Sequence, residues 1–261
     1  MSSEKENRIV VFGSIVQDLV SYTDRFPSPG ESVRGNDFKS GSGGKGANQA
    51  VAAARLGAKV SMIGMVGDDV FGELNIKGLK ENGVDTSGIG KTNKTHTATA
   101  TITVNKEAEN SIVVTLGANL EMSAETADSF ESLIANSKMV MCQGEIDEKA
   151  NRRAFEIARK HGVTTFFNPA PGDPNMDKSI LELVDIVCTN ENEAEFITGI
   201  KIKTTINALD AGSKMASMGP EHAIITLGAK GIVIVNKKRM LRKRHEYSSN
   251  QSESSGHNRS R

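Results

Sequence analysis

Residues 138–167, KMVMCQGEIDEKANRRAFEIARKHGVTTFF, contain one complete strand–helix–strand unit. The apolar run Lys138–Cys142 predicts a strand, Glu148–His161 predicts a helix that Gly162 ends, and Val163–Phe167 predicts a second strand. The second strand lacks the alternation of a half-exposed strand, so we expect helices on both of its faces. This stretch therefore predicts an α/β fold with a mostly parallel sheet.

The same alternation continues on both sides of this unit. Further strands are expected at Ile9–Phe12, Val60–Val66, Asp185–Cys188, Ala223–Thr226 and Ile232–Val235, and further helices at Gly44–Ala58, Val70–Asn82, Ala124–Ala135, Glu191–Ile197 and Asn207–Met218. Two segments differ from this pattern. The runs Thr97–Val104 and Ser111–Leu116 flank a polar turn, as in a hairpin, and Ser32–Ser40 is extended and polar. We expect a small β lid formed by segments near 14–40 and 97–116.

Composition excludes several classes of protein. The 261 residues include 32 basic and 32 acidic side chains, so the global charge favours neither a nucleic acid nor a membrane partner. No apolar run has the length of a membrane span, and the N-terminus predicts no signal peptide. Cys142 and Cys188 each lie in an apolar run, which is typical of buried thiols in a reducing compartment. We therefore expect a cytoplasmic protein.

The C-terminal end has a different character. Residues 237–261 contain eight Lys or Arg against two Glu, a local charge of +6, and few apolar residues. Such a segment buries too little surface to offset its ordering entropy, so we predict a basic disordered tail. Its basic run at 237–244 is, alternatively, a polyanion-binding or localisation signal, which leaves a nuclear location and a weak effect on nucleic acid open.

The strongest local motif is Gly41–Gln49, with glycines at 41, 43, 44 and 46. It follows no first strand of a βαβ unit, so it is a poor dinucleotide fingerprint, and Lys45 is followed by Gly46 rather than Ser or Thr, unlike a phosphate-binding P-loop. Glycines let the backbone approach a ligand, and the following helix presents free N–H groups. With Lys45 and Asn48 as donors, the motif suits a polyhydroxylated ligand. A turn that packs the helix on the sheet is the alternative.

Several polar groups follow predicted strands. Asp18 and Glu145 come after the first strand and after Lys138–Cys142, where carboxylates face the ligand crevice of an open α/β sheet and accept hydroxyl hydrogen bonds. Helix or turn caps are the alternative for both. Asn168–Pro171 predicts a rigid loop or turn. No histidine lies in a catalytic pattern.

Two further motifs suit a nucleotide. Asn190 and Glu193 place an amide and a carboxylate on one side of a helical turn, which either holds a hydrated Mg²⁺ near phosphates or forms a capping box. Thr226–Gly231 is a strand end leading into a glycine turn, which suits ribose or phosphates and is alternatively a plain hairpin turn.

Together, these motifs resemble the ribokinase (PfkB) family of carbohydrate kinases. The resemblance extends from about Ile9 to Val235, and its specific parts are Gly43–Gln49, Gly117–Asn119, Asn168–Pro171, Asn190 with Glu193, and Thr226–Gly228. It implies a Rossmann-like, mostly parallel sheet flanked by helices, with a small β lid. It also implies ATP-dependent phosphorylation of D-ribose to D-ribose 5-phosphate, Mg²⁺, a monovalent cation such as K⁺, and a homodimer formed through the lid.

The resemblance also assigns site residues. Those that match the family's sugar site are Val16, Gln17, Asp18, Gly44, Lys45, Gly46, Ala47, Asn48 and Glu145. Those that match its nucleotide site are Asn190, Thr226, Leu227, Gly228, Ala229, Lys230 and Gly231, with Glu193 holding Mg²⁺ through water.

One family signature, D-T-x-A/G-A/G-G-D, does not occur in the 261 residues. In the family this segment forms the anion hole for the phosphoryl group, contributes cation ligands and contains the catalytic Asp. The sequence therefore predicts an incomplete α/β domain over 1–236, without its C-terminal part, and no catalytic base. Loss of an anion hole and a general base together predicts activity at least 10⁴-fold below a complete homologue. It also predicts an exposed apolar patch where the family has further helices.

Three alternatives remain open for the function. The chain is a shortened, inactive isoform, whether from splicing, a frameshift or a gene-model error, that binds sugar or pairs with full-length subunits. It is another sugar or nucleoside kinase of the same family. Or it is a polyanion binder that acts through its basic tail.

Overall fold

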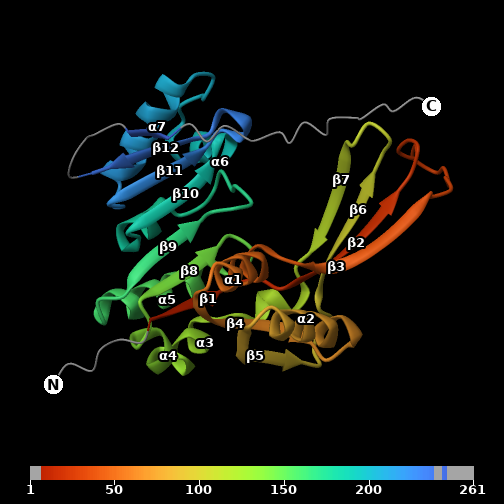
Figure 1. The fold of residues 1–261 in the computed structure, drawn as a ribbon, viewed down its shortest axis with the longest axis horizontal. Coiled ribbons are helices and arrows are strands. Elements are labelled where there is room, and N and C mark those ends of the chain that lie inside the picture. Colours follow the sequence, from red (N-terminus) through yellow and green to blue (C-terminus); the bar gives the residue numbers. More distant parts are fainter. Residues whose placement is uncertain (1–6, 238–242, 246–261) are drawn as a thin grey trace, which may run out of the picture.

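The computed structural model describes residues 7–237 and the backbone of residues 243–245, which form two sheets (Figure 1). The main sheet has nine strands in the order β13-β12-β11-β10-β9-β8-β1-β4-β5. The strands are β1 (Arg8–Phe12), β4 (Lys59–Gly67), β5 (Val84–Thr92), β8 (Met139–Gln143), β9 (Thr164–Asn168), β10 (Ile186–Asn190), β11 (His222–Thr226), β12 (Ile232–Asn236) and β13 (Lys243–His245). All neighbours from β5 to β11 are parallel, which confirms the predicted α/β fold.

The second sheet is the expected lid, on the right in Figure 1. Its order is β3-β2-β6-β7, with β2 (Val16–Tyr22), β3 (Asp37–Gly43), β6 (Ala98–Val104) and β7 (Asn110–Thr115). The predicted hairpin is β6–β7, which pairs antiparallel. Only three residues separate β1 from the lid strand β2, so the lid is joined directly to β1 of the main sheet.

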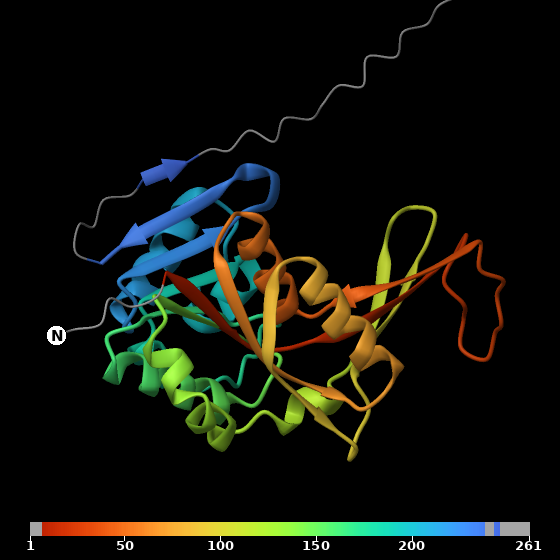
Figure 2. The ribbon, with the colours of Figure 1, turned by 60° about the horizontal axis from the view of Figure 1, so that its bottom comes forward.

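Helices cover the main sheet from both sides. The helices are α1 (Lys45–Arg55), α2 (Val70–Glu81), α3 (Ala124–Ser129), α4 (Glu131–Ala135), α5 (Glu148–Lys160), α6 (Glu191–Thr198) and α7 (Thr205–Ser217), with short 3₁₀ turns at Gly117–Glu121, Lys178–Leu183 and Gly228–Lys230. α1 and α2 pack on one face and α3–α7 on the other (Figure 2). On the larger face, Phe155 of α5 contacts Phe167 of β9 edge-to-face at 5.6 Å.

One predicted helix differs from the structure, and two strands had no prediction of their own. The helix expected at Ala124–Ala135 is two helices that meet at Phe130, whose backbone leaves the helical region. Strand β2 lies within the lid segment expected near 14–40 but was not predicted as a separate strand, and β5 was not predicted, because neither carries a continuous apolar run. Their extended form depends on pairing with strands distant in sequence.

In the part of the chain that the structure describes, helices cover only one face of β9–β12, which differs from the expectation of helices on both faces. Residues facing α5–α7 are buried, whereas every second residue is partly exposed. The apolar side chains on that second face are Phe166, Ile186, Cys188, Ile224, Ile232 and Ile234. On this face the described helix α1 packs on β1, β4 and β8. Among the described residues, an apolar face thus continues beyond the edge of α1.

The predicted disordered tail falls mostly outside the described residues. Within it, the backbone of Lys243–His245 pairs antiparallel with β12. Among the described residues, no helix is long and apolar enough to cross a membrane.

Candidate functional site

The order of the main sheet places a topological switch point beside β1. After β1 the chain builds β4 and β5 on one side, and β8 to β11 then follow on the other side. Ligands of open α/β folds bind at such a switch point, outside the carboxyl ends of the strands. Ser14 follows β1 and Glu145 follows β8, and the Ser14 Oγ donates a hydrogen bond of 2.5 Å to the Glu145 Oε2. Two loops 131 residues apart in sequence therefore meet at the switch point.

The N-terminus of α1 lies at the same switch point. Its N-cap, Gly44, has no side chain to cap the helix. Instead, the Lys45 backbone N–H donates to the Glu145 Oε2 at 2.8 Å, and the Gly46 N–H donates to the Ser14 Oγ at 3.1 Å. Since the first N–H groups of a helix carry partial positive charge, they stabilise the Glu145 carboxylate.

Close backbone approach explains the glycines at 44 and 46. Gly44 has a positive φ of 93°, and a Cβ there would lie 2.8 Å from the Val16 backbone nitrogen. A Cβ at Gly46 would lie 2.6 Å from the Ser14 backbone nitrogen. The glycines of Gly41–Gln49 therefore do pack the helix against the sheet, which was the alternative interpretation of this motif. The same packing places the N-terminus of α1 next to Glu145.

A second carboxylate, that of Asp18, lies near enough to the first for the charge of Glu145 to act on it. Asp18 lies inside lid strand β2, not beyond a strand end as the sequence predicted, and it caps no helix or turn. Its carboxylate lies over Gly43, where any Cβ would clash with it. Burial, and then the negative charge of Glu145, raise the pKa of Asp18 above 3.8. The lid and the main sheet thus present two acidic groups to one space.

The remaining predicted sugar-site residues have different environments. The Lys45 Nζ lies 3.9 Å from the Glu145 Oε1, and the Asn48 side chain is exposed on the first turn of α1. Val16 and Ala47 are buried in apolar clusters, so only their backbone is available to a ligand.

The Gln17 side chain, predicted to belong to the sugar site, is hydrogen-bonded within the protein. Its Nε2 donates to the Gly41 carbonyl at 2.9 Å, and its Oε1 accepts from the Asn75 Nδ2 at 2.9 Å. The side chain is 2% exposed. Its amide therefore ties the lid to α2.

Sequence reasoning assigned no role to two residues that shape this site. Ser14 belongs to no motif that the sequence analysis singled out. The Asn119 Oδ1 accepts from the Ile15 N–H at 3.0 Å, and its Nδ2 donates to the Ile15 carbonyl at 3.2 Å. This buried pair holds the link between β1 and β2, and the motif Gly117–Asn119 was its signal in the sequence.

The predicted nucleotide residues lie on the neighbouring strand ends. Asn190 and Thr226 are register partners at the ends of β10 and β11. Thr226–Gly231 is the turn of the β11–β12 hairpin, as in the hairpin alternative.

Asn190 and Glu193 form the capping box of α6. The Glu193 Oε2 accepts from the Asn190 N–H and its Oε1 from the Asn190 Nδ2, both at 2.9 Å. Each carboxylate oxygen keeps a free lone pair, so the pair still fits a metal-bound water. No three acidic, His or Cys side chains of the described residues cluster for direct metal ligation.

Comparison with known proteins agrees with this geometry. The model of the "pfkB family carbohydrate kinase" matches residues 6–247. A mouse protein named ribokinase is 42% identical over 234 residues, which cover 90% of this chain and 72% of the relative. A deoxyribokinase of Salmonella typhi is 37% identical, covering 85% of this chain and 73% of the relative. The structure of an Arabidopsis thaliana ribokinase with ribose and ATP has a TM-score of 0.85 at 26% identity, covering 92% of this chain and 78% of that one.

Proposed function

Because the chain belongs to the pfkB family of carbohydrate kinases, we propose that its switch-point site binds D-ribose for ATP-dependent phosphorylation to D-ribose 5-phosphate. The observation that carries this proposal is the contact of Glu145 with the N-terminus of α1, with the Asp18 carboxylate close enough to feel the charge of Glu145. Two carboxylates accept hydrogen bonds from several hydroxyls, which an apolar or anionic ligand does not supply. A pentose supplies them on a rigid ring.

The predicted sugar-site residues would contact the sugar in different ways. Asp18 and the free Oε1 of Glu145 accept sugar hydroxyls, and Lys45 and Asn48 donate to sugar oxygens. Val16, Gly44, Gly46 and Ala47 contribute backbone, and Gln17 holds β2 in place.

The nucleotide would lie along the ends of β10 and β11. Asn190 and the turn Thr226–Gly231 line that edge, beside the switch point. Glu193 would hold Mg²⁺ through water, and the ion would neutralise phosphate charge. K⁺ remains part of the proposal through the family alone.

A second candidate is sugar binding without phosphoryl transfer. It is favoured by the lack of the D-T-x-A/G-A/G-G-D signature in these 261 residues. Phosphoryl transfer depends on positioning and charge stabilisation at the moving group. A chain of these residues would then bind ribose and release little ADP.

One experiment tests both candidates. D-Ribose, 2-deoxy-D-ribose and adenosine are titrated calorimetrically into the purified chain, and ADP release is followed beside a ribokinase that has the D-T-x-A/G-A/G-G-D signature. We expect ribose binding, with ADP release at least 10⁴-fold slower than that of the ribokinase with the signature. Lack of ribose binding refutes the proposed substrate. Near-equal ADP release refutes our placement of the catalytic base. Preference for another ligand makes this a different kinase of the family.

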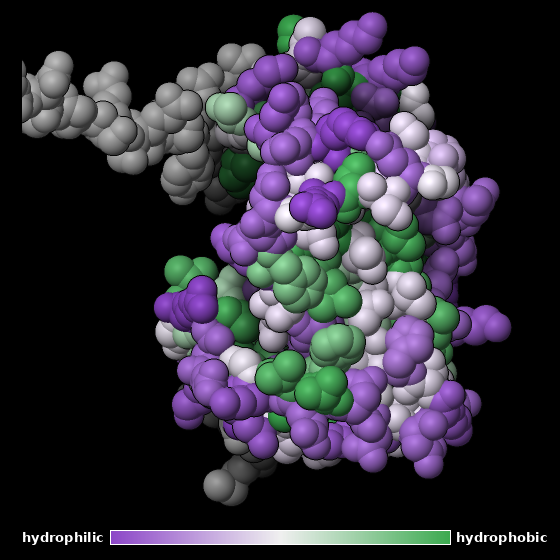
Figure 3. Space-filling view, turned by 90° about the vertical axis from the view of Figure 1, so that its right-hand side faces the viewer, coloured by the Kyte–Doolittle hydropathy of each residue, from purple (hydrophilic) through white to green (hydrophobic). Residues whose placement is uncertain are grey.

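We also propose that two copies pair through the lid in the cytoplasm. Figure 3 views the molecule from the lid side and shows apolar side chains gathered on this face. The exposed apolar residues of the lid include Phe38 on β3 and Ile112, Val113 and Val114 on β7, and Val113 is 67% exposed. Sedimentation of the Val113→Lys variant as a monomer, against a dimeric parent, supports this pairing, and a monomeric parent contradicts it. The nuclear alternative gains no support from the comparisons.

A further inference from the structure

The Ser14 side chain is polar, yet 0% of it is exposed. Both hydrogen-bonding capacities of its hydroxyl are used: the Oγ donates to the Glu145 Oε2 at 2.5 Å and accepts from the Gly46 N–H at 3.1 Å. One hydroxyl thereby joins the loop after β1, the loop after β8 and the first turn of α1.

These contacts divide the two oxygens of Glu145. Its Oε2 accepts from both Ser14 and the Lys45 N–H, the latter at 2.8 Å. Its Oε1 forms an ion pair with the Lys45 Nζ at 3.9 Å, which is beyond hydrogen-bonding distance, and no described side chain donates a hydrogen bond to it. One oxygen is therefore fixed by the protein, and the other is left to accept from a ligand.

We infer that Ser14 is a positioning residue that fixes the Glu145 carboxylate so that Oε1 faces the sugar. This inference rests on the proposed function, because the orientation of Oε1 matters only if a hydroxylated ligand binds and donates a hydrogen bond to it. Ser14 does not touch the ligand in this account. Removing its hydroxyl leaves the Lys45 N–H as the remaining described donor to the Glu145 Oε2, so the carboxylate is held less firmly, and it leaves the buried Gly46 N–H without its acceptor.

The expected effect follows from a hydrogen bond to a charged group. Loss of such a bond weakens the interaction that depends on it by about 10- to 100-fold. The Ser14→Ala variant should therefore bind D-ribose at least tenfold more weakly. Ser14→Thr, which keeps the hydroxyl, should restore most of the affinity.

A matched control is available in Ser137. It is also 0% exposed, and its Oγ donates to the Ile134 carbonyl at 2.8 Å, away from the switch point. Ser137→Ala deletes the same atom from an equally buried place. We expect it to lower stability without changing ribose affinity.

The test is a double-mutant cycle on the full chain, with Ser14→Ala and Glu145→Gln alone and together. Ribose affinity is measured by calorimetry, and urea unfolding is measured without sugar. We expect Ser14→Ala to lose its effect on affinity in the Glu145→Gln background. Equal losses in both backgrounds, or unchanged affinity in Ser14→Ala, overturn the inference.

The cycle also separates this inference from the proposed function. If the parent chain binds no sugar, the proposed function fails, and the sugar-free urea cycle then decides the Ser14 inference. Strictly additive effects on unfolding would show that Ser14 does not hold Glu145, and would overturn it. If Ser14→Ala does not fold, Ser14→Thr and Ser14→Cys take its place, and affinity independent of hydroxyl retention overturns the inference.

Discussion

Replacement of Asp18 by Asn should move sugar affinity and stability in opposite directions. The Asp18 carboxylate is half-buried and lies in the field of Glu145, which together raise its pKa above 3.8. Because the folded state then holds the proton more tightly than the unfolded state, ionised Asp18 destabilises the fold. This destabilisation is absent at low pH and develops as the pH rises through the raised pKa. Asp18→Asn should therefore raise the urea midpoint at pH 7 and change it little at pH 3.

The effect on affinity has the opposite sign. Asp18 has two charged acceptor oxygens, and Asn keeps one neutral acceptor and adds donors. One hydrogen bond to a charged group contributes about 1.5–3 kcal/mol, so we expect ribose binding to weaken about 100-fold, or about 2.7 kcal/mol.

Calorimetric ribose titration and urea unfolding of the same preparations measure both effects. Asp37→Asn is the matched control, since Asp37 lies on β3 at the other end of the β2–β3 ladder with an exposed side chain. It should bind ribose as the parent does. Ribose affinity of Asp18→Asn within threefold of the parent, or a lower urea midpoint at pH 7, would refute the reasoning.

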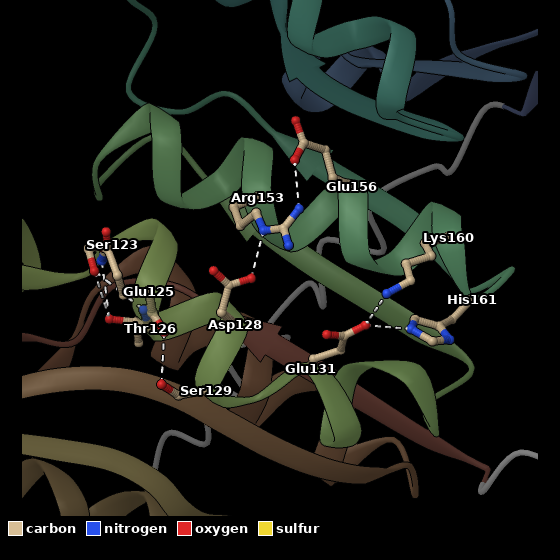
Figure 4. A network of polar contacts seen from close by, with 10 residues as sticks. All are labelled: Ser123, Glu125, Thr126, Asp128, Ser129, Glu131, Arg153, Glu156, Lys160 and His161. Atoms are coloured by element: carbon tan, nitrogen blue, oxygen red, sulfur yellow. Dashed lines mark hydrogen bonds and ion pairs between the residues drawn. The ribbon is translucent and has the colours of Figure 1, made fainter.

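Three further predictions concern stability. Asn119→Ala should lower the free energy of unfolding, measured by urea denaturation, by about 2–5 kcal/mol, because it leaves the buried N–H and C=O of Ile15 unpaired. A loss below about 1 kcal/mol would contradict a stabilising role for this pair of hydrogen bonds. Glu131 accepts hydrogen bonds from His161 and Lys160, both at 2.8 Å (Figure 4), which lower its pKa to about 2. The stability that ionised Glu131 contributes is present above the ordinary pKa of 4.5 and is lost as the pH falls toward 2. Glu131→Gln should therefore lower the melting temperature at pH 7 and lower it much less at pH 3. Equal decreases at both pH values would exclude the charge of Glu131 as the cause. Phe166→Thr, on the apolar face of β9, should slow aggregation measured by light scattering, and an unchanged rate would mean that this face is already covered.

Local signals accounted for most of the main sheet. The α6 capping box at Asn190–Glu193 could be read from four consecutive residues, and the predicted helix at Glu148–His161 matches α5 within one residue. The lid strand β2 carries Gln17, Asp18 and Ser21, and no local pattern distinguishes it from a loop. It is a strand because β3 and β6 pair with it on both sides.

The same limit applies to the candidate site. The residue types at Asp18, Lys45 and Glu145 indicated a hydroxylated ligand before any geometry was known. The sequence could not show that Ser14 joins Glu145, because 131 residues separate them and the contact exists only through the strand order. The sequence also could not predict that helices cover only one face of β9, because the run Val163–Phe167 is apolar enough for a strand covered on one face or on both faces.

Under the proposed function, sugar binding and phosphoryl transfer use structurally separate parts of this chain. Every hydrogen bond described at Ser14 and Glu145 joins residues of the β1–β8 half of the molecule, and none involves β10 or β11. The sugar half is therefore assembled before any nucleotide arrives. Ribose at 100 times its dissociation constant should then stabilise the fold by about 2.7 kcal/mol with or without ATP. A requirement for ATP before ribose stabilises the fold would show that the strand ends of β10 and β11 help to build the sugar site, contrary to the contacts described.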